Sequence, residues 1–176
     1  MSILKVAHLG HPAIRKVASP LSEKEINSEK IQILIDHMIE TMHEYDGVGL
    51  AAPQIHISKQ IAVIEVKDNP RYPGVPKVPL TVLINPHIKN RSKKFADEWE
   101  GCLSIPDLRG VVPRSESLTC EALDRYGKSI KIEASGFFAR VIQHECDHLE
   151  GRVYLDRMHD LTSLTHLLEF ARYHAE

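Results

Sequence analysis

Two histidines spaced four residues apart, with a glutamate directly after the first, constrain this chain more than any other feature of its sequence. The segment reads His144-Glu145-Cys146-Asp147-His148. Residues at this spacing share one face of a helix, so both imidazoles can reach a single metal ion. Glu145 projects beside that face, where it can contact a water molecule at the metal without being a ligand. The pattern predicts a metal-binding helix that also carries a general base.

A chance pair of histidines is the alternative, because the chain contains eleven of them. Only His144 and His148 have the four-residue spacing, and only they carry the glutamate in the right place. They also lie in a helix that otherwise has the pattern of a buried one, where unpaired polar groups are costly. The metal-site interpretation is therefore favoured over an ordinary surface or core pair.

Two histidines leave a catalytic site incomplete, because such sites usually have three protein ligands and an open position. The third ligand could be His, Glu, Asp or Cys. Cys102 is favoured, because the glycine before it in Glu100–Ser104 allows close backbone approach. Cys120 lies on an alternating strand and is expected to be core, while Cys146 points away from the face that the histidines share. A distant histidine or acid stays open as the alternative.

The helices are predicted from apolar residues at helical spacing. Residues Ile31 to Met42 form one continuous apolar face, with Ser28 as the N-cap. The metal-binding helix is expected to begin after Ser135-Gly136 and to stop at Gly151. A last amphipathic segment is expected to start at Asp160.

Strands are predicted between these helices. Ile61–Val66 and Leu80–Ile84 are strand-like, with the second closed by Asn85-Pro86, and residues 118–134 form a hairpin. Gly47–Gln54 is expected to be a loop, and a proline-rich loop covers residues 69–76, where Arg71 and Tyr72 could border the site. A block of strands with helices at either end indicates an α+β architecture.

Composition limits the classes of protein that need to be considered. A chain of 176 residues fits one domain, residues 1–176, and its net charge of -2 gives no electrostatic case for nucleic-acid binding. No apolar run is long enough to span a bilayer. Three cysteines and no secretory or transit-type N-terminal segment favour a reduced, cytoplasmic setting.

Three separated segments make the chain similar to the peptide deformylase family. They are Gly47–Gln54, Glu100–Ser104 and Gln143–His148, in the order and with the separations of that family. The resemblance extends from near the N-terminus to about Met158. It implies a compact bacterial-type fold, with antiparallel sheets packed around the central metal-binding helix and a further helix at each end.

The resemblance also implies residue roles. Cys102, His144 and His148 would bind the metal, with water as the fourth ligand. Glu145 would transfer protons, Gln54 and the backbone N–H of Leu103 would stabilise the oxyanion, and Gly49 would contact the substrate backbone. The apolar residues Val48, Phe137 and Val141 could line a pocket for a methionine side chain, although the periodicity of the last two is equally that of core residues. Gln143 either orients the metal site or is an ordinary polar helix residue.

The implied reaction is hydrolysis of the formyl group of N-formylmethionyl peptides on nascent chains, releasing formate. The implied cofactor is one divalent metal ion, Fe²⁺ physiologically, with Zn²⁺, Ni²⁺ or Co²⁺ as substitutes. The family and the N-terminus favour the bacterial cytoplasm. The resemblance leaves room for transient ribosome contact, but the C-terminal segment is not strongly basic, so the docking inferred for some bacterial members does not carry over.

The sequence leaves open two other kinds of metal site and the burial of one ion pair. Another His-Glu-x-x-His zinc peptidase would usually take its third ligand from a downstream His or Glu. His159, His166 and His174 follow the motif, but none has the downstream spacing of the metzincins. A structural Cys/His site would have four protein ligands. Glu100 and Arg114 could form a buried pair, but the sequence alone favours a solvated surface pair.

Overall fold

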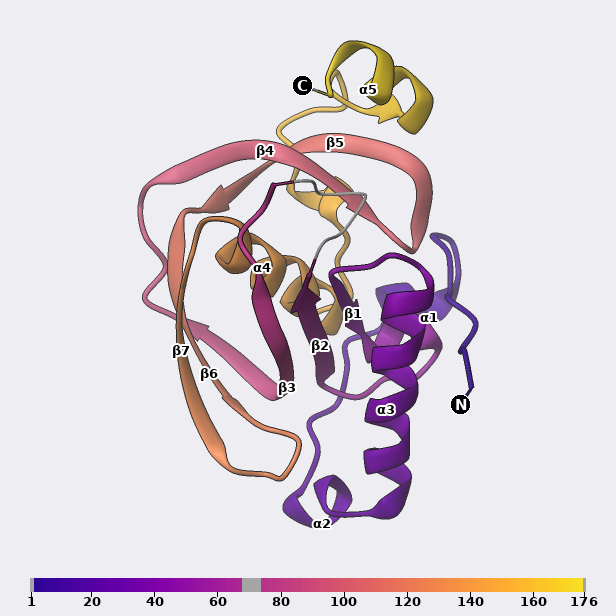
Figure 1. The fold of residues 1–176 in the computed structure, drawn as a ribbon, viewed down its shortest axis with the longest axis vertical. Helices are drawn as coiled ribbons and strands as arrows, with labels where there is room; N and C mark the ends of the chain where they lie inside the picture. The colour runs from indigo at the N-terminus through magenta and orange to yellow at the C-terminus, as the bar shows by residue number, and fades with distance from the viewer. Residues whose placement is uncertain (1, 68–73, 176) are drawn as a thin grey trace.

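A computed structural model describes residues 2–67 and 74–175 of the chain. Two antiparallel sheets enclose helix α4 (Gly136–Leu149), which contacts strands of both, and helices α3 (Glu29–Glu44) and α5 (Leu167–Tyr173) lie outside them (Figure 1). The predicted α+β class, with a central helix and flanking helices, is confirmed. Most of the predicted proline-rich loop, with Arg71 and Tyr72, lies outside the described residues.

Among the described residues, the larger sheet has five strands in the order β1-β2-β3-β6-β7, and every neighbouring pair is antiparallel. Its strands are β1 (Gly49–Ala51), β2 (Ile61–Val66), β3 (Val78–Lys89), β6 (Ser117–Leu123) and β7 (Ser129–Ser135). The predicted strand over residues 61–66 and the predicted hairpin are confirmed. The hairpin forms because apolar and polar residues alternate on both sides of a tight turn.

The smaller sheet, in the part of the chain that the structure describes, has three strands in the order β4-β5-β8. They are β4 (Phe95–Cys102), β5 (Ile105–Ser115) and β8 (Thr165–His166). The turn between β4 and β5 is tight, and Cys102 pairs with Ile105 across a shift in register. The sequence did not reveal β4, because acidic residues interrupt its apolar positions. This strand carries Cys102 to the motif on α4.

Short helices complete the chain: α1 (Pro12–Arg15), α2 (Glu23–Ile26) and the 3-10 helices η1 (Ala52–Ile55) and η2 (Tyr154–Arg157). Ser28 caps α3 as predicted, because its side chain accepts a hydrogen bond from the Ile31 amide. Helix α4 begins at Gly136, one residue before the start predicted after Ser135-Gly136.

Three predicted boundaries are wrong. The predicted loop over Gly47–Gln54 contains strand β1 and helix η1, because its small residues are fully buried between larger elements. Strand β3 does not stop at Asn85-Pro86 but bulges there, with Asn85 at φ 50. The last helix begins at Leu167 rather than near Asp160, since Thr165 and His166 pair with β5 first.

The core lies on both faces of the larger sheet. On β2, Ile61 and Val63 pack toward α3, whereas Ala62 and Ile64 pack toward α4. Successive side chains on a strand point to opposite faces, so a strand buried on both sides is continuously apolar. The apolar run of β2 therefore fixes the sheet between the two helices, with α4 inside the molecule.

Gly151 connects α4 to the C-terminal segment and should be intolerant of a side chain. Its φ is 72, and a Cβ there would lie 2.5 Å from the carbonyl oxygen of Arg15. We expect Gly151→Ala to lower the free energy of unfolding by about 3 kcal/mol or more, measured by urea denaturation.

Gly136→Ala is the matched control for Gly151→Ala. Gly136 also has a positive φ, 56, but a Cβ there would meet no atom of the described residues within 4 Å. Gly136→Ala should lower the free energy of unfolding by only about 1 kcal/mol, which is the cost of the positive φ alone. Equal losses in the two variants would contradict the role assigned to the Arg15 carbonyl.

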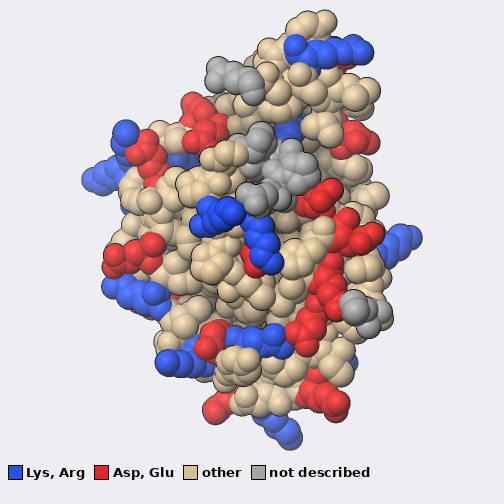
Figure 2. All heavy atoms as spheres, in the orientation of Figure 1, with Lys and Arg blue, Asp and Glu red and all other residues tan. Residues whose placement is uncertain are grey.

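The surface drawn in Figure 2 carries both signs of charge. Acidic side chains gather in a column over the position of α3, and Lys and Arg side chains lie on either side of that column. None of the described helices is both long and apolar enough to cross a bilayer.

Candidate metal centre

Three side chains from two elements converge on one point. Helix α4 presents His144 and His148 on consecutive turns, and Cys102 approaches from the end of β4. One potential ligand atom from each residue lies within 4.8 Å of the other two. The Cys102 Sγ lies 3.2 Å from His148 Nε2. The predicted pair and the favoured third residue are therefore brought together.

The donor set and its surroundings fit a divalent metal ion. His144 Nδ1 lies 2.9 Å from Glu100 Oε2, which leaves Nε2 for a ligand, the usual arrangement around a metal-binding histidine. Burial alone would raise the pKa of the Cys102 thiol, but the charges and hydrogen bonds of His148 and His144 hold that pKa well below its usual value. Thiolate and imidazole together suit zinc and ferrous iron alike.

Glu145 faces the same site but is not one of the three converging residues. Its carboxylate is buried, and Oε2 has no hydrogen-bond partner among the described residues. Burial raises the pKa of Glu145 to about 7, against the opposing charges of His144 and His148. A carboxyl group whose pKa lies near neutral pH is suited both to accept a proton and to return it.

Gln54 is held by η1 with its amide directed at the thiol. Its Oε1 accepts a hydrogen bond from the Ala51 amide at 2.8 Å, which fixes the side chain. Its Nε2 lies 3.6 Å from Cys102 Sγ and 3.2 Å from Ser104 Oγ. A preset amide donor at this point can bind a developing oxyanion.

A pocket opens beside these residues. Val48, Gly49, Leu103, Phe137 and Val141, all predicted to lie at the site, line it. Two further residues of its lining, Trp99 and Arg140, were missed, because β4 was not recognised and Arg140 lies outside the motif segments. The other lining residues are Gly47, Gln54, Glu100, Gly101, Cys102, His144 and Glu145.

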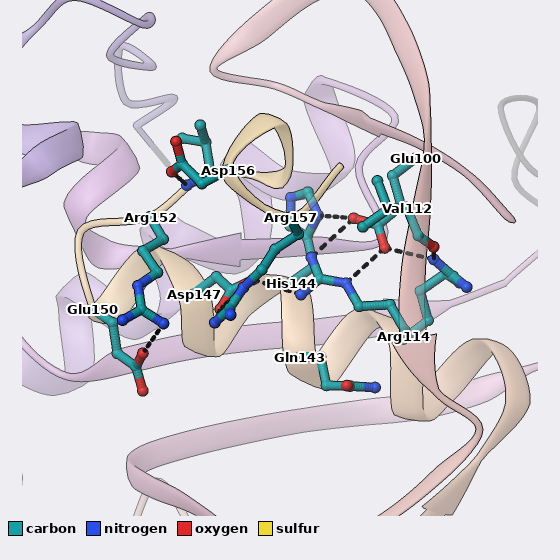
Figure 3. A network of polar contacts seen from close by, with 12 residues as sticks. Glu100, Val112, Arg114, Gln143, His144, Asp147, Glu150, Arg152, Asp156 and Arg157 are labelled. Carbon is teal, nitrogen blue, oxygen red and sulfur yellow. Dashed lines mark hydrogen bonds and ion pairs between the residues drawn. The ribbon is translucent and has the colours of Figure 1, made fainter. Parts of the chain in front are cut away.

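A network of buried ion pairs surrounds Glu100, which contacts His144, and Asp147 (Figure 3). Arg114 donates to both oxygens of Glu100, at 2.9 and 3.0 Å, and also to Asp147. Arg140 donates to Glu100 at 2.7 Å, and Arg157 donates to Asp147. The network ties β4, β5, η2 and α4 together around the ligand His144.

The prediction that Glu100 and Arg114 form a solvated surface pair is wrong. Both side chains are about 5% exposed or less. The pair is buried because β4 and β5 place it directly against α4. Burial alone would raise the pKa of the Glu100 carboxyl, but the hydrogen bond to His144 and the charge of Arg114 keep it well below its usual value.

Gln143, left undecided by the sequence, joins α4 to β5. Its Nε2 donates to the Ser115 carbonyl at 3.0 Å, and its Oε1 accepts from the Ser115 amide at 3.2 Å. It contacts backbone rather than a metal-ligating side chain, so it sets the position of the helix against the sheet. Of the other cysteines, Cys120 is buried core as predicted, and Cys146 is not in the ligand cluster.

Removing Glu100 should weaken both the fold and the metal site. Glu100→Ala would leave Arg114 and Arg140 partly uncompensated in the interior, so we expect a loss of about 3–5 kcal/mol in the free energy of unfolding. Metal affinity should fall by about 10–100-fold, because His144 loses its orienting partner. Denaturation and competition with a chelator would measure the two effects.

Glu98→Ala is the control for Glu100→Ala. Glu98 lies on the same strand and also binds Arg140, but its side chain is 52% exposed. An exposed pair contributes little, so the expected loss is below about 1 kcal/mol, with metal affinity unchanged. A similar effect of both variants would show that burial does not set the importance of Glu100.

The position of the downstream histidines argues against the alternative peptidase. His159 Nε2 lies 4.0 Å from Asp97 Oδ1, His166 caps α5, and the ring of His174 packs on Trp99. Within the described residues, the ligand cluster consists of Cys102 and the two motif histidines. A closed structural site would need a fourth protein ligand.

Comparisons with known proteins agree with this geometry. The family model described as polypeptide deformylase matches residues 3–163. Peptide deformylase 1 of Bordetella pertussis is 46% identical over 157 residues, 89% of this chain and 88% of that protein. Peptide deformylase 2 of Pseudomonas putida is 45% identical over 158 residues, 90% of this chain and 89% of that protein.

Solved structures give the same result for the fold. The Met-Ala-Ser-bound crystal structure of the class I type b peptide deformylase from Acinetobacter baumannii matches with a TM-score of 0.87 and 40% identity, over 89% of this chain and 99% of that one. The peptide deformylase from Thermotoga maritima matches with a TM-score of 0.80 and 35% identity, over 91% of this chain and 100% of that one.

Proposed function

The chain belongs to the peptide deformylase family, and from this premise we propose how its residues remove the formyl group from N-terminal formylmethionine. The enzyme is a metal-dependent hydrolase that releases formate. The observation that carries the assignment of roles is the convergence of Cys102, His144 and His148 beside a pocket that holds Glu145 and Gln54.

Cys102, His144 and His148 would hold the metal, which when bound polarises the formyl carbonyl and lowers the pKa of a water molecule toward neutrality. Glu145 accepts a proton from the attacking water, through the carboxylate that faces the site. As the bond between the formyl carbon and the amide nitrogen breaks, Glu145 returns a proton to the leaving amine. Formate and a free N-terminal methionine result.

The charge that develops on the formyl oxygen is stabilised by donors set in place beforehand. Gln54 Nε2 lies close to the Cys102 sulfur and so close to the reacting group. The backbone N–H of Leu103, the next residue after Cys102, supplies the second donor. Each donor of such a pair is typically worth about 3 kcal/mol of transition-state stabilisation.

The substrate is positioned by the walls of the pocket. Gly49 lies on β1 against Glu145 and offers backbone groups to the peptide. Val48, Phe137 and Val141 surround the methionine side chain, whose burial would contribute about 1.5–3 kcal/mol if complete. The peptide Met-Ala-Ser in the Acinetobacter structure supports a product of this class.

We propose Fe²⁺ as the physiological ion, with Zn²⁺, Ni²⁺ or Co²⁺ as substitutes that the Cys-His-His set would also accept. The substrates are nascent chains in the bacterial cytoplasm, with at most transient ribosome contact. The bacterial sources of the related enzymes support this setting. The contacts of α4 with both sheets support residues 1–176 as one catalytic domain.

The decisive test is formate release from formyl-Met-Ala-Ser by protein prepared without oxygen, with the metal content measured in the same sample. Release that depends on the formyl group, and no cleavage of unformylated Met-Ala-Ser, would support the proposed reaction. Absence of formate release from iron- or nickel-loaded protein would contradict it. Activity lost with a chelator should return with Fe²⁺.

A further inference from the structure

Trp99 connects the pocket to the C-terminal segment of the chain. It lies on β4 within the pocket lining. Its ring meets Phe170 of α5 with centroids 5.1 Å apart in a T-shaped contact, and His174 at 5.0 Å. Aromatic rings at such distances contribute more than their buried area alone. One residue therefore contacts both the site and the end of the chain.

Phe170 is held on two sides. Besides Trp99 on β4, the guanidinium of Arg109 on β5 lies over its ring, 5.1 Å from the centroid. Arg109 is itself only 4% exposed. Phe170 thus occupies a defined place across the β4–β5 hairpin, rather than lying loosely on its surface.

The rest of the C-terminal segment is attached to the same hairpin. Ser163 accepts a hydrogen bond from the Val111 amide at 3.1 Å, and β8 pairs with Leu108 and Arg109. Figure 1 shows α5 beside β4 and β5, outside the sheet. Helix α5 itself has no buried residue, so its position depends on these few contacts.

Cys102, the metal ligand that β4 carries, lies on the face of the strand that is buried toward α4. Glu100 and Cys102 are buried toward α4, whereas Trp99 alternates with them and is half-buried. Arg114 and Arg140 hold Glu100 independently of α5. A change at Phe170 should therefore move the outer part of the pocket wall without dismantling the metal centre.

We propose that the C-terminal segment acts as a clamp that sets the pocket wall at Trp99, with Phe170 as its positioning residue for peptide binding. This inference rests on the proposed function for the identity of the peptide. Loss of the Phe170 ring lets Trp99 leave the position that the peptide requires. Peptide affinity then falls, while the reaction of bound substrate changes little.

The test uses the full chain with Phe170→Ala, and with Phe170→Tyr as the conservative variant. Trp99 is the only tryptophan of the sequence, so intrinsic fluorescence reports on its surroundings directly. We expect a shifted emission maximum in Phe170→Ala. We also expect a three- to tenfold rise in the KM for formyl-Met-Ala-Ser, roughly the loss of one aromatic pair, with kcat within about twofold of the parent. Phe170→Tyr should restore both.

Leu168→Ala is the matched control, because Leu168 lies on the same helix and is 63% exposed. It should leave emission and KM unchanged. The proposal is overturned if Phe170→Ala has the emission and KM of the parent, if Leu168→Ala has the same effect, or if kcat falls while KM stays constant. Thermal unfolding of each variant identifies a general loss of fold, which would also count against it.

Calorimetric binding of the product peptide Met-Ala-Ser keeps this inference separate from the proposed function. If the parent protein releases no formate but binds the peptide, the proposed function fails. The clamp is then tested separately by the affinity of Phe170→Ala for Met-Ala-Ser. A three- to tenfold weaker affinity in that variant would support the clamp. Equal affinity, or a parent that binds no peptide, would overturn it.

Discussion

Replacing Glu145 with glutamine should lower the rate of formate release by about 10²–10⁴-fold while the protein keeps its metal. Glutamine has nearly the same shape, so it fills the same buried position. It cannot accept the proton of the attacking water or return one to the leaving amine. The three converging ligand side chains are untouched, so metal binding should persist. The measurement is kcat together with metal content in the same preparation.

Glu150→Gln is the control for this change, because Glu150 directly follows α4 and its side chain is 55% exposed. It should have parental activity. Retained activity in Glu145→Gln would show that another group transfers the proton. Loss of metal together with activity would show instead that Glu145 acts mainly in maintaining the centre.

The sequence predicts the metal helix well because its information is local. The spacing of His144 and His148 requires only a regular helix to bring the imidazoles onto one face. The N-cap at Ser28 and the hairpin of β6 and β7 are likewise set by neighbouring residues. In each case a short stretch of sequence determines the geometry.

Cys102 is harder to predict, because its role depends on pairing between distant segments. Sequence reasoning favoured it without excluding a distant histidine or acid. The structure selects it because the β4–β5 hairpin places its thiol 3.2 Å from His148 Nε2. The acidic residues of β4 hide that strand from pattern analysis, and with it the contribution of Trp99 to the pocket.

The sequence gives the least information about which charged residues are buried. Glu100 and Arg114 are fourteen residues apart and look like surface residues, yet both are enclosed with Asp147 and Arg140. Buried charged side chains are tolerated inside a protein only when each charge has a partner of opposite sign. Whether partners from three elements meet is a property of the tertiary fold, which a single sequence does not display.

Gly49 shows how a glycine can be required by its neighbour rather than by its own backbone. Its φ is not in the left-handed region, so an alanine would fit the strand. A Cβ at this position would, however, lie 2.3 Å from Glu145 Oε1. The carboxylate would have to move, and a displacement of this size at a reacting group can cost about 100-fold in rate. We expect Gly49→Ala to fold normally and to lose about 100-fold in kcat/KM.

The double variant Gly49→Ala/Glu145→Gln distinguishes this mechanism from a simple loss of substrate contacts. If the alanine acts by displacing Glu145, it should cost little further activity once the carboxylate is gone, because the two changes remove the same step. If Gly49 acts only through its backbone contacts with the peptide, the two losses should multiply. Thermal unfolding and metal content, measured on all four proteins, should stay close to the parent. A strongly destabilised Gly49→Ala would contradict the expectation that the flexible end of Glu145, and not the strand, gives way.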